Sequence, residues 1–331
     1  MVTLLGLSVA VILVIFAFYS IFGLMGTTFA VGNHKEWREL IANPPDYGLE
    51  STKVNFASED GTPIAAWWLS SKRTNREKGT IILIHGSGGN RSSMLSRASF
   101  LVKNGYKVLA VDLRAHGESG GNYMGLGYLE AKDVIAGAEY ATQHNAPRPI
   151  IAMGYSLGGV AALHAASQSN KLDAVISDSA FVSQADLLQR AQRILVKDKN
   201  TPLPMKLAIA MTRLPFVEQS VEFSFYLRTR LWLSNRDPKL SALTAVKKLN
   251  GKPVLFISGE NDEIAPLENA KRMYETADSK MKELGVMYGM DHSTYKPDYE
   301  PYEQKVLEFL DRITKSDDRR AEVQPEFISA L

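Results

Sequence analysis

The sequence of 331 residues contains no cysteine. This absence excludes disulfide bonds, thiolate metal sites and a cysteine nucleophile. An excess of one charge is also missing, because 38 Lys and Arg residues stand against 36 Asp and Glu residues, for a net charge of +2. So balanced a composition provides no basic surface for nucleic acid, and we expect no nucleic-acid partner.

The first 33 residues lack Lys, Arg, Asp and Glu altogether. Residues 4–25 are apolar apart from two serines and interspersed glycines, and about 20 helical residues span the core of a bilayer. The basic n-region of a cleavable signal peptide is missing, and the apolar run is longer than a usual h-region. We therefore predict an uncleaved transmembrane anchor over residues 1–33. Cleavage near residues 28–30, with secretion, is the alternative.

The rest of the chain divides by composition. Residues 34–52 are predicted as a linker, residues 53–314 as the main domain, and residues 315–331 as a flexible tail that is charged and poor in apolar residues. Lys35 and Arg38 follow the anchor and only the amino terminus is basic before it. The positive-inside tendency then favours a cytoplasmic location for the main domain.

Short apolar runs alternate with helical stretches from residue 80 onward, a pattern typical of a parallel sheet covered on both faces. Two strands around the Asp60-Gly61 turn, 53–58 and 64–69, are predicted to form an antiparallel edge. The rhythm breaks between residues 180 and 241, which we predict as a mostly helical lid insertion. The other expected strands are 80–84, 107–111, 150–155, 174–176, 254–257 and 283–287, and the expected helices include 92–104, 129–144, 241–249, 267–277 and 302–313.

The apolar run Ile150 to Tyr155 ends on Ser156, which has Gly154 two residues before it and Gly158 two residues after it. This G-x-S-x-G pattern is typical of a nucleophile elbow, a sharp strand-to-helix turn that holds the serine in strained backbone geometry and needs small neighbours. A glycine-rich turn with an inert serine is the alternative, so the rest of the sequence must decide.

A serine hydroxyl becomes a nucleophile when an imidazole, itself oriented by a carboxylate, takes its proton. Among the six histidines, His292 follows the last predicted strand and can reach the carboxyl edge of the sheet. Asp262 follows the preceding strand at the same edge and is the preferred acid; Asp178 is the reserve, and Glu260 is disfavoured because it comes earlier in the turn. Each residue alone fits an ordinary surface position, but the order Ser156, Asp262, His292 at strand ends predicts a catalytic triad.

An oxyanion formed at the serine also needs backbone N–H donors. We expect one from Leu157, the residue after the nucleophile, and the other from Ser87 in the glycine-rich loop 85–90. No Gly-Lys-Ser or Gly-Lys-Thr follows that loop, which disfavours phosphate binding. His85 is expected to support the loop rather than to act as a base.

Five motifs carry a family resemblance: the elbow, His85-Gly86, Asp112 to Ser119, Gly259 to Asp262 and Asp291-His292. Together they resemble the α/β-hydrolase superfamily and, more narrowly, membrane-anchored serine hydrolases of the Bem46 and ABHD type. The resemblance covers about residues 54–313 and implies an α/β-hydrolase fold with an eight-stranded, mostly parallel sheet and helices on both faces. It also implies cofactor-free hydrolysis of an ester, thioester or amide through an acyl-enzyme on Ser156.

Two details qualify the resemblance. Ala115 stands where the family commonly has glycine in Arg-Gly-His-Gly, which affects only the local turn. Serine at the elbow disfavours the dehalogenases and epoxide hydrolases of this fold, which use aspartate there. No metal-ligand spacing such as H-E-x-x-H occurs, so we expect no metal and no other cofactor.

The leading hypothesis is a carboxylic-ester hydrolase that acts on a partly apolar, small-molecule acyl substrate. One alternative is a serine peptidase similar to the prolyl-oligopeptidase group, although the chain has no room for a propeller domain before residue 54. Another is a membrane-anchored binding protein without catalysis. A lipid ester is a further candidate substrate, with residues 207–211 and 223–226 dipping into the bilayer; packing of these residues against the core is the simpler explanation.

Overall fold

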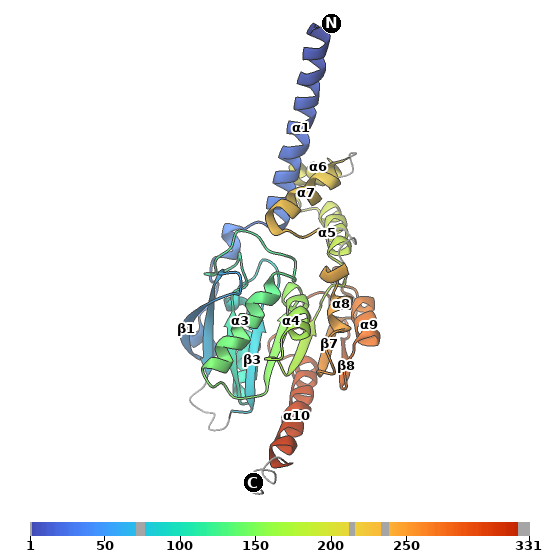
Figure 1. The fold of residues 1–331 in the computed structure, drawn as a ribbon. Coiled ribbons are helices and arrows are strands. Elements are labelled where there is room, and N and C mark those ends of the chain that lie inside the picture. The colour runs from blue at the N-terminus through green and yellow to red at the C-terminus, as the bar shows by residue number, and fades with distance from the viewer. Residues whose placement is uncertain (1, 71–76, 212–215, 233–237, 324–331) are drawn as a thin grey trace.

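The structure is a computed structural model that describes residues 2–70, 77–211, 216–232 and 238–323. Some sequence predictions fall outside the described residues: parts of the insertion at 212–215 and 233–237, and the end of the tail at 324–331. The described chain forms one body from which a long N-terminal helix projects at one end, while the C-terminal helix points out at the other (Figure 1).

Eight strands form a single sheet in the order β1-β2-β4-β3-β5-β6-β7-β8. β1 pairs with β2, and β2 with β4, in antiparallel fashion, whereas every other neighbouring pair is parallel. The predicted eight-stranded, mostly parallel sheet is confirmed. The strands are Glu50–Ala57 (β1), Pro63–Ser70 (β2), Gly79–Ile84 (β3), Tyr106–Val111 (β4), Ile150–Tyr155 (β5), Ala174–Asp178 (β6), Val254–Gly259 (β7) and Lys282–Met287 (β8).

The antiparallel edge forms where the Asp-Gly turn predicted it. Gly61 has a φ of 81°, a left-handed conformation that glycine adopts without strain, and Ser58 N–H donates to the Thr62 carbonyl at 2.9 Å to close the turn. In the middle of the sheet, β3 is buried along its whole length, as expected of an Ile- and Leu-rich strand covered on both faces.

Helices cover both faces of the sheet, as predicted. One hydrophobic cluster joins one face to α3, α4, α8 and α9, and a second joins the other face to α2 and α10. Helices α5 to α7 occupy the region predicted as an insertion. The helices are Val2–Val31 (α1), Leu95–Lys103 (α2), Glu130–Gln143 (α3), Leu157–Gln168 (α4), Gln184–Lys197 (α5), Leu203–Met211 (α6), Val217–Thr229 (α7), Ala242–Val246 (α8), Leu267–Thr276 (α9) and Glu300–Val323 (α10).

Helix α10 is longer than the sequence analysis predicted. It continues to Val323, so the tail expected from residue 315 begins inside a helix. No glycine follows Glu300 in this stretch, and the single proline, Pro301, lies in the first helical turn, where proline is tolerated. Nothing in the backbone therefore stops the helix at residue 313.

The segment predicted as a linker is folded onto the main domain. It contains two 3₁₀ turns, Lys35–Trp37 and Pro44–Tyr47. The Trp37 indole stacks on the His116 ring, with ring centres 4.8 Å apart and planes within 7°. The Arg38 guanidinium donates to the carbonyl oxygens of Gly117 and Ser119 at 3.2 and 2.7 Å. The composition of the segment predicted a linker, but it could not predict these contacts with the main domain.

The C-terminal part of α1 packs against α7. The Thr27 hydroxyl lies 3.2 Å from the Val221 carbonyl oxygen, and a Cβ at Gly23 would come within 2.5 Å of the Ser220 carbonyl oxygen. Glycine at position 23 thus permits close approach of the two helices. The structure describes the side chains of α1 at residues 13–28 and at Val31. Among the residues whose side chains the structure describes, no helical stretch is both long and apolar enough to cross a membrane.

Candidate active site

Ser156 lies at the sharp turn between β5 and α4. Its backbone has a φ of 52° and a ψ of −115°, a conformation that costs free energy in any residue with a side chain. The Ser156 N–H donates to the Asp178 carbonyl at 2.8 Å, which ties this turn to the end of β6. The G-x-S-x-G pattern therefore forms the strained strand-to-helix turn that it predicts.

The two flanking glycines are required by close backbone packing. A Cβ at Gly154 would come within 2.1 Å of the Gly158 carbonyl oxygen, and a Cβ at Gly158 within 2.5 Å of the His85 carbonyl oxygen. Real side chains do not tolerate such distances. The elbow is thus pressed against the loop that follows β3.

His292 and Asp262 meet Ser156 at the carboxyl edge of the sheet. The His292 Nε2 atom lies 3.0 Å from the Ser156 hydroxyl oxygen, and its Nδ1 atom lies 2.7 Å from Asp262 Oδ2. Because a carboxylate only accepts, Nδ1 carries the proton and Nε2 is free to accept from the serine. The structure brings together the three side chains that the sequence analysis selected, although they are up to 136 positions apart.

The Asp262 carboxylate is held in a fixed orientation. Its side chain is fully buried, and its Oδ1 atom accepts hydrogen bonds from the backbone N–H groups of Ile264 and Ala265 at 2.9 and 2.7 Å. Oδ2 is thereby left for His292. Glu260, by contrast, accepts from the exposed Gly289 N–H at 3.0 Å, and within the described residues it makes no hydrogen bond to the imidazole.

The loop after β3 packs directly on the serine. A Cβ at Gly86 would lie 2.9 Å from the Tyr155 ring and 3.3 Å from the Ser156 Cβ. Among the described residues, no group accepts a hydrogen bond from the Ser87 N–H. The Leu157 N–H belongs to the first turn of α4, where backbone donors have no partner within the helix. Both predicted donors are therefore available, while their catalytic role stays a prediction.

Comparisons with known proteins agree with this arrangement. The family Hydrolase_4, described as serine aminopeptidase S33, matches residues 75–297, which include the elbow, Asp262 and His292. The chain belongs to this family.

Two curated relatives and one solved structure extend the comparison. The uncharacterized protein YqkD of Bacillus subtilis is 29% identical over 275 residues, 81% of this chain and 82% of YqkD. Protein bem46 of Schizosaccharomyces pombe is 22% identical over 234 residues, 69% of this chain and 66% of bem46. The Pyrococcus furiosus esterase Pf2001 superposes with a TM-score of 0.66 at 25% identity, covering 83% of this chain and 98% of the esterase. The predicted resemblance to α/β-hydrolases of the Bem46 and ABHD type is confirmed.

Two further histidines of this α/β-hydrolase support the loop after β3. His85 Nε2 accepts from the Leu113 N–H at 3.0 Å, and His116 Nε2 accepts from the Gly88 N–H at 3.3 Å. Burial lowers the pKa of His85 to about 4. Burial, together with the neighbouring His85, lowers the pKa of His116 to about 3. Both rings are therefore neutral at pH 7, and both act as fixed acceptors within the fold.

A buried ion pair lies directly after the end of the same loop. The Arg91 guanidinium contacts the Asp112 carboxylate, and both side chains are almost fully buried. Asp112 also accepts from the Glu118 N–H at 2.8 Å. Because removal of one partner would leave an uncompensated buried charge, this pair holds the segment Asp112 to Ser119 against the 3₁₀ turn Arg91–Met94 (η3).

Asp178, the reserve acid, does not contact the His292 imidazole in any recorded interaction. Its carboxylate instead accepts from the hydroxyls of Thr294 and Tyr302, at 2.7 and 2.9 Å, and from Arg97 at 3.3 Å. Sequence reasoning missed these three partners. The one available signal was Arg97, a charged residue among the apolar residues of the predicted helix 92–104.

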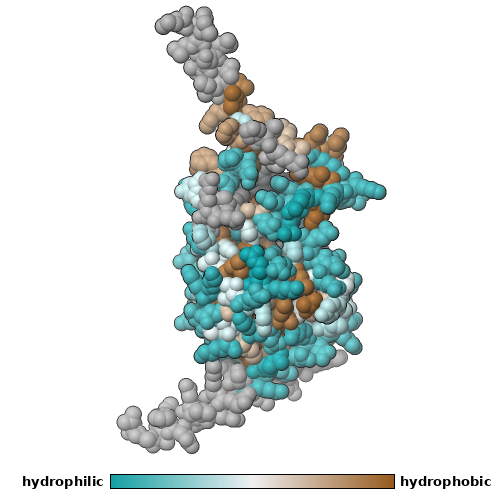
Figure 2. All heavy atoms as spheres, turned by 90° about the vertical axis from the view of Figure 1, so that its right-hand side faces the viewer, coloured by the Kyte–Doolittle hydropathy of each residue, from teal (hydrophilic) through white to brown (hydrophobic). Residues whose placement is uncertain are grey.

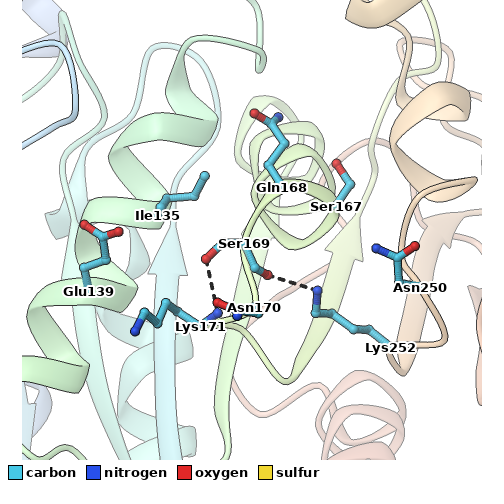
Figure 3. A pocket seen from close by; sticks show the side chains of 9 residues that line it. All are labelled: Ile135, Glu139, Ser167, Gln168, Ser169, Asn170, Lys171, Asn250 and Lys252. Atoms are coloured by element: carbon cyan, nitrogen blue, oxygen red, sulfur yellow. Dashed lines mark hydrogen bonds between the residues drawn. The ribbon is translucent and has the colours of Figure 1, made fainter.

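A separate cavity of about 490 Å³ lies near the amino ends of the strands, away from the candidate active site (Figure 3). It is lined by Ile135 and Glu139 of α3, by the end of α4, by Ser169 to Lys171 before β6 and by Asn250 and Lys252 before β7. These residues precede the strands whose carboxyl ends carry the candidate active site. The Lys252 ammonium donates to the carbonyls of Ala166 and Ser169 at 2.8 and 3.0 Å and so caps α4. Among the described residues, no cluster of acidic residues and histidines is arranged to hold a metal ion.

Proposed function

We propose that this hydrolase is a serine esterase that cleaves a carboxylic ester through an acyl-enzyme on Ser156. The observation that carries the proposal is the continuous chain of contacts from the Ser156 hydroxyl through both nitrogens of His292 to the buried Asp262. This is the arrangement that converts a weak hydroxyl nucleophile into a reactive one. The similarity to the P. furiosus protein, which is an esterase, adds support.

The proposed reaction has two steps. Ser156 Oγ attacks the ester carbonyl carbon while its proton passes to His292 Nε2, and the resulting imidazolium is stabilised by Asp262. The N–H groups of Ser87 and Leu157 donate to the oxyanion. The alkoxide then leaves with the proton from His292. In the second step, water attacks the acyl carbon while one of its protons passes to His292. The C–Oγ bond then breaks, the carboxylic acid leaves, and His292 returns the proton to Ser156 Oγ.

A fluorophosphonate probe and a series of nitrophenyl esters test the proposal. We expect the wild type to be labelled and to hydrolyse the esters, and Ser156→Ala to lose both properties. Exposed Ser293 offers a matched control, since Ser293→Ala removes a hydroxyl next to His292 outside the recorded chain of contacts. Labelling that survives Ser156→Ala would assign the nucleophile elsewhere. A folded wild type with neither labelling nor turnover would favour a binding protein.

The family description favours a serine aminopeptidase as a second candidate. The same three side chains would then attack an amide. Rates with aminoacyl-nitroanilides and with nitrophenyl esters of matched chain length separate the two candidates. A higher kcat/KM for the anilides would replace the esterase proposal by the peptidase one.

We further propose that α1 anchors the enzyme in a membrane as a single-pass helix, with the catalytic domain on the cytoplasmic side. The support is the charge-free stretch 1–33 and the exposed apolar side chains of α1 between Leu13 and Met25. Lys35 and Arg38 support the orientation. Since the chain has no cysteine, Tyr288→Cys at an exposed position of the main domain provides a unique label. Labelling of intact cells by an impermeant maleimide would place the domain outside.

The insertion is proposed to act as a lid that rests on the bilayer. Leu207, Phe223 and Leu227 are 56, 54 and 51% exposed, and hydrophobic surface gathers at the end of the molecule where α1 projects (Figure 2). Residues 180–241 also carry ten basic and five acidic side chains, which suits an anionic surface. Phe225, in contrast, is buried and packs the lid, so only part of 223–226 is available to lipid.

A fluorophore placed on the lid tests this contact. In vesicles that contain quencher-labelled lipids, a label at Phe223→Cys should be quenched, whereas one at Tyr288→Cys should not. Equal fluorescence at both positions would exclude lid contact with the bilayer. Comparing hydrolysis of vesicle lipid with that of soluble short-chain esters then tests a lipid substrate, which a preference for the soluble esters would count against.

A further inference from the structure

Asp178 lies behind the candidate active site and contacts two of its segments. It ends β6, and its side chain is 1% exposed. Through its backbone carbonyl it accepts from the Ser156 N–H at 2.8 Å. Through its carboxylate it accepts from the Thr294 hydroxyl, which lies 2.7 and 2.8 Å from the two oxygens. One residue thus joins the nucleophile turn to the segment that carries His292.

The His292 segment is held at a second point as well. The His292 carbonyl oxygen accepts a hydrogen bond from the Tyr155 hydroxyl at 3.1 Å. It also lies 3.3 Å from the Ser179 hydroxyl oxygen, whose single proton is shared with Asp178 Oδ1 at 3.2 Å. Tyr155 precedes the nucleophile and Ser179 follows Asp178. The backbone on the C-terminal side of the imidazole is therefore held by residues from the ends of β5 and β6, in addition to the bond from the Ser293 N–H to Asp291 within its own loop.

A buried cation lies against the Asp178 carboxylate. The Arg97 guanidinium, on α2, contacts Asp178 at 3.3 Å and is only 10% exposed. It is surrounded by the rings of Tyr155, Tyr295 and Tyr302 at 5.1, 4.7 and 5.5 Å. The Asp178 carboxylate is thus held between a buried guanidinium on one element and the Thr294 hydroxyl on another.

We propose that Asp178 and Thr294 are positioning residues for His292: the buried carboxylate holds the Thr294 hydroxyl, and this contact sets the distance between the imidazole and the Ser156 hydroxyl. The proposal rests on the esterase function proposed above. It assigns Asp178 a role different from that of a triad acid. The carboxylate of a triad acid contacts the imidazole, whereas the Asp178 carboxylate contacts Thr294, two residues after His292.

Substitution of Thr294 tests the role. Thr294→Val removes the hydroxyl and keeps the shape of the side chain, Thr294→Ala removes it without placing a methyl group against the carboxylate, and Thr294→Ser retains it. The matched control is Thr80→Val, because Thr80 is equally buried and donates to the Pro147 carbonyl at 2.7 Å from the start of β3, at the other edge of the sheet. Ester hydrolysis and thermal unfolding are measured on the full chain.

A misplacement of about 1 Å can cost about 10²-fold in rate, so we expect Thr294→Val and Thr294→Ala to lower kcat by about that factor with KM unchanged. Thr294→Ser should retain kcat, and Thr80→Val should lower the unfolding midpoint without lowering kcat. Wild-type kcat in either folded hydroxyl-free variant, or an equal loss in Thr294→Ser, would overturn the proposal. An inactive, unlabelled wild type would instead overturn the esterase function, and this proposal with it.

Discussion

Replacement of Asp262 by asparagine should disable the enzyme while leaving its shape intact. In the structure, Oδ1 accepts from the N–H groups of Ile264 and Ala265, and Oδ2 accepts from His292 Nδ1–H. The asparagine carbonyl keeps the two backbone bonds if its amide nitrogen takes the place of Oδ2. The opposite orientation would set an NH₂ group against two N–H donors, so the first orientation is favoured by two hydrogen bonds to one.

The amide nitrogen of the variant then faces Nδ1, and two donors cannot pair. The imidazole escapes this conflict by carrying its proton on Nε2 instead, and Nε2 can no longer accept the proton of Ser156. A wrong tautomer of this kind lowers kcat by about 10⁴-fold, or about 5 kcal/mol of activation free energy, with little effect on KM.

Steady-state hydrolysis of a nitrophenyl ester measures this loss. Asp291→Asn is the matched control, since Asp291 is the exposed neighbour of His292 and accepts only from the Ser293 N–H at 2.8 Å among the recorded contacts. We expect the control to keep its kcat. A fall of less than about tenfold in Asp262→Asn would refute the tautomer argument and would reopen the assignment of the acid.

Three further predictions concern the loop after β3 and the segments around it. Gly86→Ala should lower kcat by about 10²-fold in ester hydrolysis, because its Cβ would meet the Tyr155 ring at 2.9 Å and displace the loop that carries Ser87; Gly137→Ala on α3, where the nearest contact is 3.4 Å, should not. Trp37→Ala should lower the free energy of unfolding by about 2 kcal/mol in urea titrations, because it removes the half-buried indole stacked on His116; an unchanged value would show that the segment 34–49 does not contribute to stability. Acidification from pH 7 to 5 should also destabilise the fold. His85 and His116 have pKa values of about 4 and 3 when folded against 6.5 when unfolded, so below pH 6.5 the unfolded chain binds more protons. Each histidine should cost about 2 kcal/mol at pH 5, and His116→Gln should reduce the loss; equal stability at the two pH values would contradict it.

Much of the fold follows from local patterns in the sequence. Apolar runs such as Ile81 to Ile84 have no other stable place than the middle of a covered sheet, and the Asp60-Gly61 turn selects an antiparallel hairpin. The elbow is equally local, since Gly154, Ser156 and Gly158 determine its geometry within five residues. For this reason the succession of the strands along the chain and their approximate bounds could be predicted.

Asp262 and His292 could also be selected from the sequence as partners of Ser156, because residues that follow neighbouring parallel strands meet at the carboxyl ends of those strands. The sequence could not determine what the other polar residues at that edge would do. Asp178 and Asp262 both follow strands, and only the tertiary structure decides that one carboxylate contacts the imidazole while the other contacts Thr294.

The packing of the N-terminal region was decided by tertiary structure alone. Composition marked residues 34–52 as a linker, yet Trp37 stacks on His116, and α1 packs against α7 through Gly23 and Thr27. Periodicity and turn residues act over a few positions and can be read directly from the chain. Contacts between segments 79 to nearly 200 positions apart depend on shapes that exist only after the sheet and its helices have formed.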